Sequence, residues 1–300
     1  MQSPNKLRFV TTSWDDGDSA DLKVAELLRL KGIHGTFYIP INYRQKPLSQ
    51  GELRTLASEG FEIGAHGWSH KHLWRLPPED VGQEVRPCKH VLEDILGKRV
   101  EMFCYPRGRY DPNVVRGLKE AGYKGARTVR MLATRLTFDP FEMPTSLEAF
   151  PHVPLTYVKN VARARSLESF QSFLIHLPRV RSWLALGKRL FDRVLENGGV
   201  WHLFGHSWQI EQLGLWDDLR EILDYVCRRD GVRYVPNCAL LQPQLASPHA
   251  SKICERFAHG PQAAVQGAAI LGEEKSGPAL SRIARIRQRA ARKQTSPHWH

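Results

Sequence analysis

Residues 7–32 read LRFVTTSWDDGDSADLKVAELLRLKG, and this stretch decides the predicted fold. The apolar and β-branched run over residues 7–13 predicts a strand that ends at two adjacent acids. Val24, Leu27 and Leu28 follow at helical spacing, so residues 20–30 are predicted to form a helix that Gly32 stops. The unit is a strand, an acidic turn and a helix.

The same alternation continues to about residue 240. Further strands are predicted over residues 34–39, 61–65, 100–105, 123–128, 199–205 and 232–235, and helices over residues 53–59, 78–96, 111–122, 187–196 and 216–228. Pro87 is expected to kink or split its helix. Residues 130–186, which are rich in proline, are expected to form extended loops and irregular helix. This order predicts an α/β fold with a mostly parallel sheet.

Composition fits one globular body with a basic tail. The chain has 300 residues, 42% of them hydrophobic, and a formal net charge of +12. Residues 246–300 carry nine Lys/Arg and three acids, hence half of that charge. We therefore expect a domain over residues 1–245 and a disordered tail over residues 246–300. The five cysteines contain no CxxC pair, so a thiolate zinc site is not favoured.

Polar residues follow several predicted strands, and in β/α barrels the carboxyl ends of the strands carry the chemistry. Asp15 and Asp16 end the first strand, and adjacent carboxylates can divide the tasks of base and metal ligand. His66 and His70 lie four apart after a later strand, a spacing that lets two imidazoles share one metal. Singly, each pattern is equally compatible with a turn or a packed histidine.

Two further segments follow strands. Phe103-Cys104-Tyr105-Pro106-Arg107-Gly108 contains a residue flanked by Pro and Gly, which predicts a tight loop able to aim a backbone N–H at a ligand. Leu203-Phe204-Gly205-His206-Ser207 ends a strand in a histidine suited to act as a general acid.

Taken together and in this order, these segments resemble the polysaccharide deacetylase family, also called the NodB-homology domain or carbohydrate esterase family 4. The resemblance covers roughly residues 7–240. It implies a distorted (β/α)7 barrel and metal-dependent hydrolysis of an N-acetyl amide on a sugar. It also implies one divalent metal, usually zinc, and an N-acetylated glycan as substrate.

The resemblance assigns a role to each matching residue. It implies Asp15 as the base, His206 as the acid, and Asp16, His66 and His70 as metal ligands. The backbone N–H of Arg107 would bind the oxyanion, and Leu203 would line the pocket for the acetyl methyl group. Aromatic residues near the site suit stacking on sugars or packing in the core; they are Trp14, Trp68, Trp74, Tyr105, Tyr110 and Trp208. Of these, we expect Tyr105 and Trp208 to bind substrate.

The sequence departs from the family pattern at two points. Cys104 stands where the family commonly has an arginine beside the base, so we predict that Arg127 supplies this cation. The family's Asp-x-x-Asp-Trp motif has no clear match, which leaves the group that orients His206 unidentified. Two alternatives stay open: a hydrolase of the same barrel that acts on a non-sugar amide, and a non-catalytic carbohydrate-binding relic.

Location and partners follow from the charge and from the first residues. The N-terminus lacks the apolar segment of a secretory signal, so we expect a cytoplasmic enzyme. Nucleic acid is not an expected partner, because the body has no basic helix and no aromatic-basic interleaving. In the tail, Leu280, Ile283, Ile286 and Ala290 lie at helical spacing among basic residues. Such a helix would allow peripheral contact with the inner membrane surface, with a solvated tail as the alternative.

Overall fold

The computed structural model describes residues 6–44, 46–164, 166–176 and 182–241. All of them belong to the first of two compact units, which spans residues 1–260. The predicted tail over residues 246–300 lies outside the described residues, and the domain boundary at residue 245 stays a prediction. None of the helices in the described part combines the length and the apolar character that a membrane span requires.

The strands form one sheet in which every pairing is parallel. They are β1 (Arg8–Asp15), β2 (Gly35–Ile39), β3 (Glu62–Ala65), β4 (Met102–Cys104), β5 (Gly125–Arg127), β6 (Leu147–Glu148), β7 (Gly199–Gly205) and β8 (Val232–Tyr234). The order in the sheet is β5-β4-β3-β2-β1-β7-β6, and β8 pairs with the start of β1.

One short segment joins the two edges of this sheet. Met143 forms a parallel bridge with Arg127 of β5, and its backbone N–H donates to Ala126 O at 3.0 Å. A few residues later, Leu147 of β6 pairs with Leu203 of β7. The segment from Met143 to Glu148 therefore closes the strands into a barrel, and the predicted distorted (β/α)7 barrel is confirmed.

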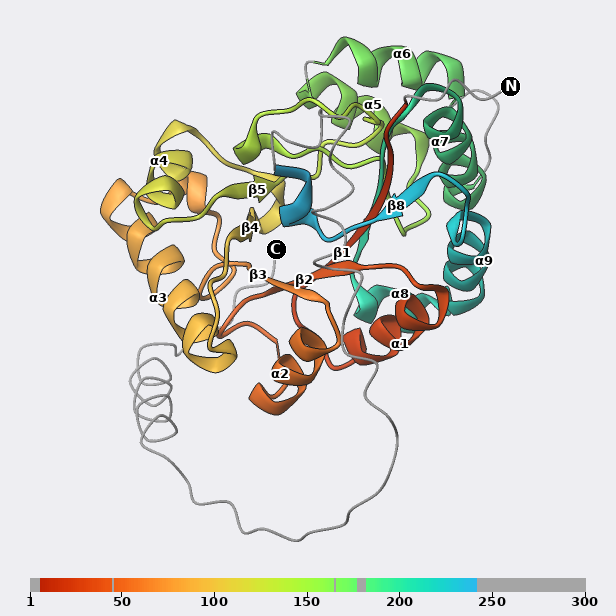
Figure 1. Cartoon of the computed structure of the whole chain (residues 1–300). Helices are drawn as coiled ribbons and strands as arrows, with labels where there is room; N and C mark the ends of the chain where they lie inside the picture. Colours follow the sequence, from red (N-terminus) through yellow and green to blue (C-terminus); the bar gives the residue numbers. More distant parts are fainter. Residues whose placement is uncertain (1–5, 45, 165, 177–181, 242–300) are drawn as a thin grey trace, which may run out of the picture. The chain divides into compact units, whose positions relative to one another are not determined.

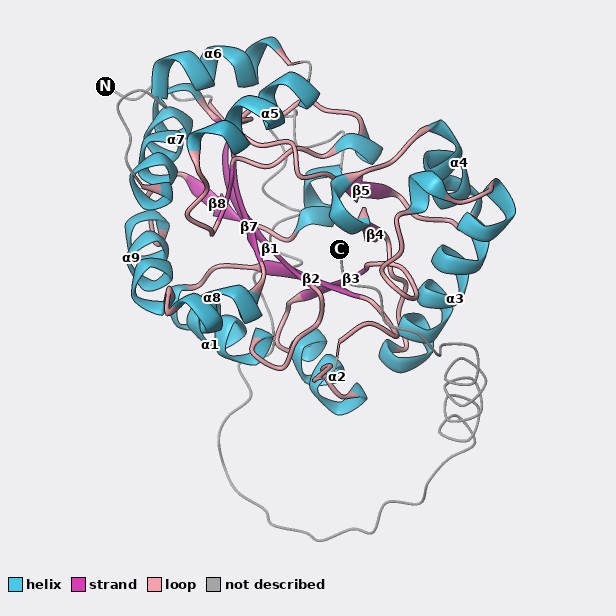
Figure 2. Cartoon of the chain, turned by 180° about the vertical axis from the view of Figure 1, so that it is seen from behind, coloured by secondary structure: helices cyan, strands magenta, loops and turns pink. Residues whose placement is uncertain are grey.

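Helices surround the barrel, as Figure 1 and the reverse view in Figure 2 show. They are α1 (Asp21–Lys31), α2 (Gln50–Ser58), α3 (Pro78–Leu96), α4 (Pro112–Glu120), α5 (Pro154–Ala164), α6 (Leu167–His176), α7 (Trp183–Asn197), α8 (Ser207–Leu213) and α9 (Trp216–Val226). Short 3₁₀ turns occur at η1 (Leu73–Arg75), η2 (Pro106–Gly108), η3 (Pro140–Glu142) and η5 (Asn237–Leu241).

Local sequence explains where several helices begin and end. Ser49 and Glu52 form a capping box that starts α2. The side chain of Asp111 accepts a hydrogen bond from Val114 N at 2.9 Å, and Pro112 occupies the first turn of α4. Gly32 ends α1 in the left-handed conformation, as its sequence position predicts.

The structure bears on two expectations about helices. Pro87 lies inside α3, which runs from Pro78 to Leu96, so the helix is not split there, and the expected kink stays a prediction. The stretch over residues 130–186 is predicted to form extended loops and irregular helix, and it contains two α-helices, α5 and α6, and the start of α7. Apolar spacing did not identify α5 and α6, because their apolar side chains lie on more than one side. Tyr157 and Val161 of α5 are buried, whereas other large apolar side chains of both helices face solvent.

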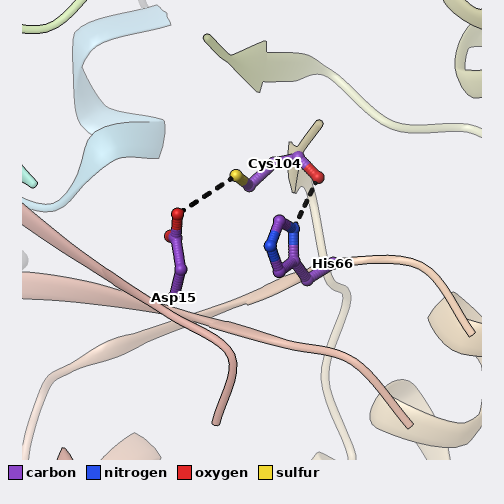
Figure 3. A group of neighbouring side chains, drawn as sticks. All are labelled: Asp15, His66 and Cys104. Carbon is purple, nitrogen blue, oxygen red and sulfur yellow. Dashed lines mark hydrogen bonds between the residues drawn. The ribbon is translucent and has the colours of Figure 1, made fainter. Parts of the chain in front are cut away.

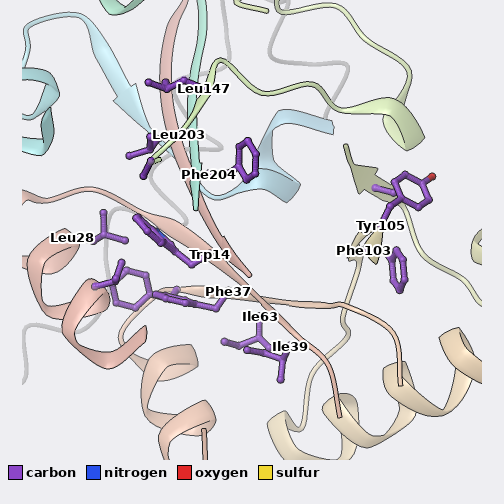
Figure 4. Close-up of a cluster of buried hydrophobic side chains, with 14 of the residues drawn as sticks. Trp14, Leu28, Phe37, Ile39, Ile63, Phe103, Tyr105, Leu147, Leu203 and Phe204 are labelled. Carbon is purple, nitrogen blue, oxygen red and sulfur yellow. The ribbon is translucent and has the colours of Figure 1, made fainter. Parts of the chain in front are cut away.

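The main apolar core fills the space between the strands and the helices. Trp14 and Leu203 on the strands and Leu28 on α1 have no exposed surface (Figure 4). Each fully buried side chain of this size adds about 1.5–3 kcal/mol to folding. Because successive side chains of a strand alternate, the neighbouring positions point into the barrel, where many are polar.

The η5 segment lies at the amino-terminal end of the barrel and forms hydrogen bonds with the strands there. The Asn237 side chain donates to Thr11 Oγ1 at 2.8 Å and accepts from the Tyr38 hydroxyl at 2.9 Å. Its backbone N–H donates to Thr36 Oγ1 at 3.0 Å. The backbone N–H of the next residue, Cys238, donates to the Glu62 carboxylate at 3.0 Å. The polar interior is thus closed at the end where the strands begin.

Candidate active site

Asp15 and Arg127 form a buried ion pair at the carboxyl ends of β1 and β5. The Arg127 guanidinium donates to Asp15 Oδ1, and both side chains are almost fully buried. Burial alone would raise the pKa of Asp15, but the charge of Arg127, aided by His66 and His206, lowers it to about 2. The predicted proximity of Arg127 to Asp15 is observed, and it keeps this carboxylate ionised.

Asp16, His66 and His70 converge beside this pair. Asp16 Oδ1 lies 3.5 Å from His70 Nε2 and 3.7 Å from His66 Nε2, and the three ligand atoms all lie within 4.8 Å of one another. Asp16 and His70 have φ values of 81° and 56°, a conformation that costs energy for side chains of this kind. The turns after β1 and β3 are therefore strained where they present these groups.

The chemistry of this group fits a divalent metal. Asp16 Oδ1 is buried with no hydrogen-bond partner among the described residues, while Oδ2 accepts from the Trp208 indole at 2.9 Å. His66 Nδ1 donates to the Cys104 carbonyl oxygen at 2.8 Å, so its Nε2 lone pair is free. Burial lowers the pKa of both imidazoles, that of His70 to about 2, and neutral imidazole is the form that binds metals.

A second set of potential ligands lies next to the first. Asp15, His66 and Cys104 also have ligand atoms within 4.8 Å of one another (Figure 3). Burial raises the pKa of the Cys104 thiol well above its ordinary value, and this thiol lies 3.7 Å from the Asp15 carboxylate, as a donor. A protonated thiol is a poor ligand, and Asp15 already binds Arg127. The Asp16 set fits a metal better.

His206 ends β7 and faces a carboxylate that the sequence did not identify. Its Nδ1 lies 3.5 Å from Glu148 Oε1, and His152 binds the other Glu148 oxygen at 2.7 Å. Burial lowers the pKa of His206, but Glu148 and the charges of Asp15 and Asp16 outweigh it and raise the pKa to about 9. This pKa favours the protonated imidazole at neutral pH, and Glu148 is the carboxylate that lies nearest to its Nδ1.

The expected substrate-binding residues are distributed differently. Leu203 and Phe204 lie on opposite faces of β7 (Figure 4). Phe204, two residues before His206, shares the inner face, and the Arg127 guanidinium lies 4.8 Å from its ring centroid. An acetyl-methyl pocket beside His206 would therefore be lined by Phe204 and not by Leu203. Tyr105 is fully buried, and its hydroxyl donates to the Phe141 carbonyl oxygen, so it offers no surface to a substrate.

Trp208 contacts the ligand set through its indole N–H, and its expected stacking on substrate stays a prediction. Its indole N–H holds Asp16, and the Arg44 guanidinium lies 4.5 Å from its ring centroid. The sequence missed this contact because the two residues are 192 positions apart. Trp208 therefore holds Asp16 in place through this hydrogen bond without belonging to the ligand set.

Arg107 is exposed in the loop that follows β4. Its φ is 57°, and the flanking Gly108 has a φ of 65°. A Cβ on Gly108 would come within 2.1 Å of a Val129 methyl group, so the close approach of these segments requires glycine. The loop conformation thus depends on the Pro-Arg-Gly sequence that predicted it, while the oxyanion role of the Arg107 N–H stays a prediction.

Asp16→Ala is expected to remove the metal. The parent protein should contain about one divalent ion per chain, and Asp16→Ala almost none, because two histidines alone leave an incomplete ligand set. Elemental analysis of the purified proteins measures this. The control is Asp217→Ala, which removes an exposed carboxylate on α9 and should keep the metal. Full occupancy in Asp16→Ala would eliminate the proposed ligand set.

Comparisons with known proteins agree with this geometry. Residues 2–126 match the family model for polysaccharide deacetylase. The chain is 23% identical over 121 residues to YxkH of Bacillus subtilis, classed as a polysaccharide deacetylase. It is 29% identical over 108 residues to the peptidoglycan-N-acetylmuramic acid deacetylase PdaC of the same organism. The matches cover 39% and 35% of this chain but only 43% and 22% of these relatives.

Solved structures extend the likeness to the rest of the fold. A protein from Mycobacterium smegmatis, classed as a polysaccharide deacetylase, has a TM-score of 0.56 at 16% identity, over 90% of this chain and 98% of that one. The chitin deacetylase of Colletotrichum lindemuthianum has a TM-score of 0.52 at 14% identity, over 81% of this chain and 92% of that one. Over residues 2–126 the chain is thus similar to polysaccharide deacetylases, and the solved structures show that it shares their fold.

Proposed function

We propose that this protein hydrolyses an N-acetyl amide on a sugar, with a divalent metal, most simply zinc, held by Asp16, His66 and His70. The observation that carries the proposal is the placement of an ionised Asp15 and a protonated His206 around that ligand set. A base and an acid beside one metal site suit the hydrolysis of an amide.

Each residue of the candidate active site has a separate role in the proposed reaction. A divalent metal bound there would polarise the acetyl carbonyl and a water molecule. The Asp15 carboxylate takes a proton from the attacking water, and Arg127 holds this carboxylate in place. The backbone N–H of Arg107 donates to the oxyanion, a contribution of about 3 kcal/mol for a donor of this kind.

The leaving amine needs a proton, and His206 supplies it. Its imidazolium is stabilised by Glu148, which is itself fixed by His152. In this arrangement a carboxylate holds the general acid in place. The proton of the His206 imidazolium is transferred to the amine nitrogen as the carbon–nitrogen bond breaks. Phe204 covers the inner face of β7 beside His206 and is suited to contact the acetyl methyl group.

The deciding experiment measures acetate release from an oligomer of N-acetylglucosamine. Purified protein should release acetate, a chelator should stop it, and added zinc should restore it. Ring opening of a cyclic imide or ureide, without release of acetate from the oligomer, would move the function to a non-sugar amide. Binding of the oligomer without release of acetate would indicate a carbohydrate-binding relic.

Glu148→Gln should shift the pH profile of the reaction. Glu148 raises the pKa of His206, so without its charge His206 loses its proton at a lower pH. The alkaline limb of the kcat profile should therefore move toward lower pH. The control is Glu120→Gln, which removes an exposed carboxylate paired with Arg86 and should leave the profile unchanged. An alkaline limb at the same pH in Glu148→Gln would rule out Glu148 as the partner of the acid.

A further inference from the structure

The hairpin of α5 and α6 turns large apolar side chains toward solvent. The two helices lie side by side (Figure 1). The exposed fractions are Leu155 57%, Val158 45%, Leu167 73%, Phe170 49%, Leu174 55% and Ile175 47%. In α6, Leu167, Phe170 and Leu174 are spaced to form one stripe along the helix. Exposed apolar residues gathered in this way mark an interaction surface, whereas isolated ones do not.

Polar contacts fix the opposite side of the hairpin to the barrel. Asn160 of α5 accepts from Met131 N at 2.8 Å and donates to Val129 O at 2.7 Å. In α6, Ser169 donates to Met131 O at 3.1 Å, and Ser172 is fully buried. These hydrogen bonds would be lost if either helix rotated about its axis. The inward polar contacts therefore keep the apolar stripe facing solvent.

The charges of the hairpin are almost all positive. Lys159 and Arg163 are exposed on α5, and neither has an acidic partner among the described residues. The one acid between residues 153 and 176 is Glu168. It is turned inward, where it accepts from the Thr134 backbone N–H at 2.6 Å and pairs with Arg135 at 3.5 Å. The outer surface is therefore apolar with cations beside it.

We propose that the α5–α6 hairpin docks on an anionic lipid surface. Apolar side chains that enter the acyl boundary and cations that meet anionic headgroups are the two contributions that hold an interfacial helix. A second copy of this chain fits less well, because a twofold interface would bring the same Lys159 and Arg163 of two copies toward each other. At 11 and 10 residues, α5 and α6 lie on a bilayer and do not cross it.

The docking surface lies beside the candidate active site. Tyr157 of α5 packs edge-on against His152, whose imidazole binds Glu148. Asn160 binds Val129 and Met131, which follow β5 and its Arg127. A bilayer held by the hairpin would therefore lie near the carboxyl ends of β5 and β6, where the catalytic groups are.

The test is co-sedimentation of the full chain with vesicles. Vesicles of phosphatidylcholine mixed with phosphatidylglycerol should carry the parent protein into the pellet, and vesicles of phosphatidylcholine alone should carry much less. The variant combines Leu167→Gln, Phe170→Gln and Leu174→Gln, which keeps every charge. Its partition onto anionic vesicles should fall at least about tenfold, because three apolar side chains no longer enter the bilayer. Matching thermal melts establish that it is folded.

The control variant combines Leu30→Gln and Leu213→Gln, whose side chains are 52% and 50% exposed on other helices, and it should bind vesicles like the parent. Equal binding by the hairpin variant and the parent would overturn the proposal and assign binding to charge elsewhere in the chain. A parent that dimerises without lipid, fails to bind vesicles and becomes monomeric in the hairpin variant would overturn it in favour of a second copy. Both readouts are independent of turnover.

Discussion

Arg127→Met should lower the free energy of unfolding by about 3–5 kcal/mol, because it leaves the Asp15 carboxylate buried without its cation. Arg127 has no exposed surface, and its guanidinium lies between the rings of Tyr38 and Phe204 at 5.3 and 4.8 Å. Methionine is apolar and flexible enough to occupy much of that space, so the loss would reflect the missing charge more than a cavity. Denaturant unfolding of metal-free parent and variant measures the difference.

The pH dependence of this difference has a definite sign. In the parent, the folded-state pKa of Asp15, about 2, lies below the ordinary value of 3.8. Asp15 therefore adds stability above that ordinary value, and this stability is lost as the pH falls through about 2. The difference in the free energy of unfolding between the parent and Arg127→Met should thus be largest near neutral pH and should decrease in acid.

Arg86→Met is the matched control for Arg127→Met. Arg86 pairs with Glu120 on the surface, where both side chains are about half exposed, and such pairs contribute about 0–1 kcal/mol. If the two variants lost the same free energy of unfolding, the buried ion pair would contribute no more to stability than the surface pair. The stabilising role of Arg127 would then have to be abandoned.

Asp15→Asn should reduce kcat by about 10²–10⁴-fold while the metal stays bound, because it removes a general base and no ligand. Asparagine keeps the oxygen to which the Arg127 guanidinium donates, so the local geometry survives better than with alanine. The measurements are the rate of acetate release, the metal content and the circular dichroism spectrum of the same preparation.

Two results with Asp15→Asn would have different meanings. A near-normal rate with metal bound would place the base on another residue. A lost rate accompanied by lost metal would mean that Asp15 belongs to the ligand set with His66 and Cys104, whose atoms lie close enough for this. The expected combination, low rate and full metal, separates the two roles of the adjacent acids.

The sequence predicted the residues that stand directly at strand ends. Asp15 and Asp16 end or follow β1, a buried strand of eight residues, and His66 directly follows β3, and parallel strands bring such ends together. Arg127 could be predicted too, because Cys104 left the base without its usual cation. The contact between Trp208 and Asp16 carries no such signal, since it depends on how the turn after β7 folds over β1.

Glu148 could not be found in this way. Its strand, β6, has two residues, and residues 130–186 gave no clear periodic pattern around it. Leu203 was assigned to the pocket by a shift of one residue, and in a strand one residue moves a side chain to the opposite face. The helices over residues 154–176 were not located for a related reason: α5 and α6 carry apolar side chains on both their buried and their exposed sides, so apolar spacing does not mark the buried face.

The contacts of η5 inside the barrel determine how far the folding unit must extend. Asn237 supplies hydrogen bonds to Thr11, Thr36 and Tyr38, all fully buried, and Cys238 supplies one to Glu62. A protein shortened to end at β8 would keep every strand yet leave the Thr11 and Tyr38 hydroxyls without the side-chain partner that Asn237 provides, at about 1–3 kcal/mol each. The smallest stable version of this domain therefore includes η5 through Leu241, although nothing in η5 touches the catalytic groups.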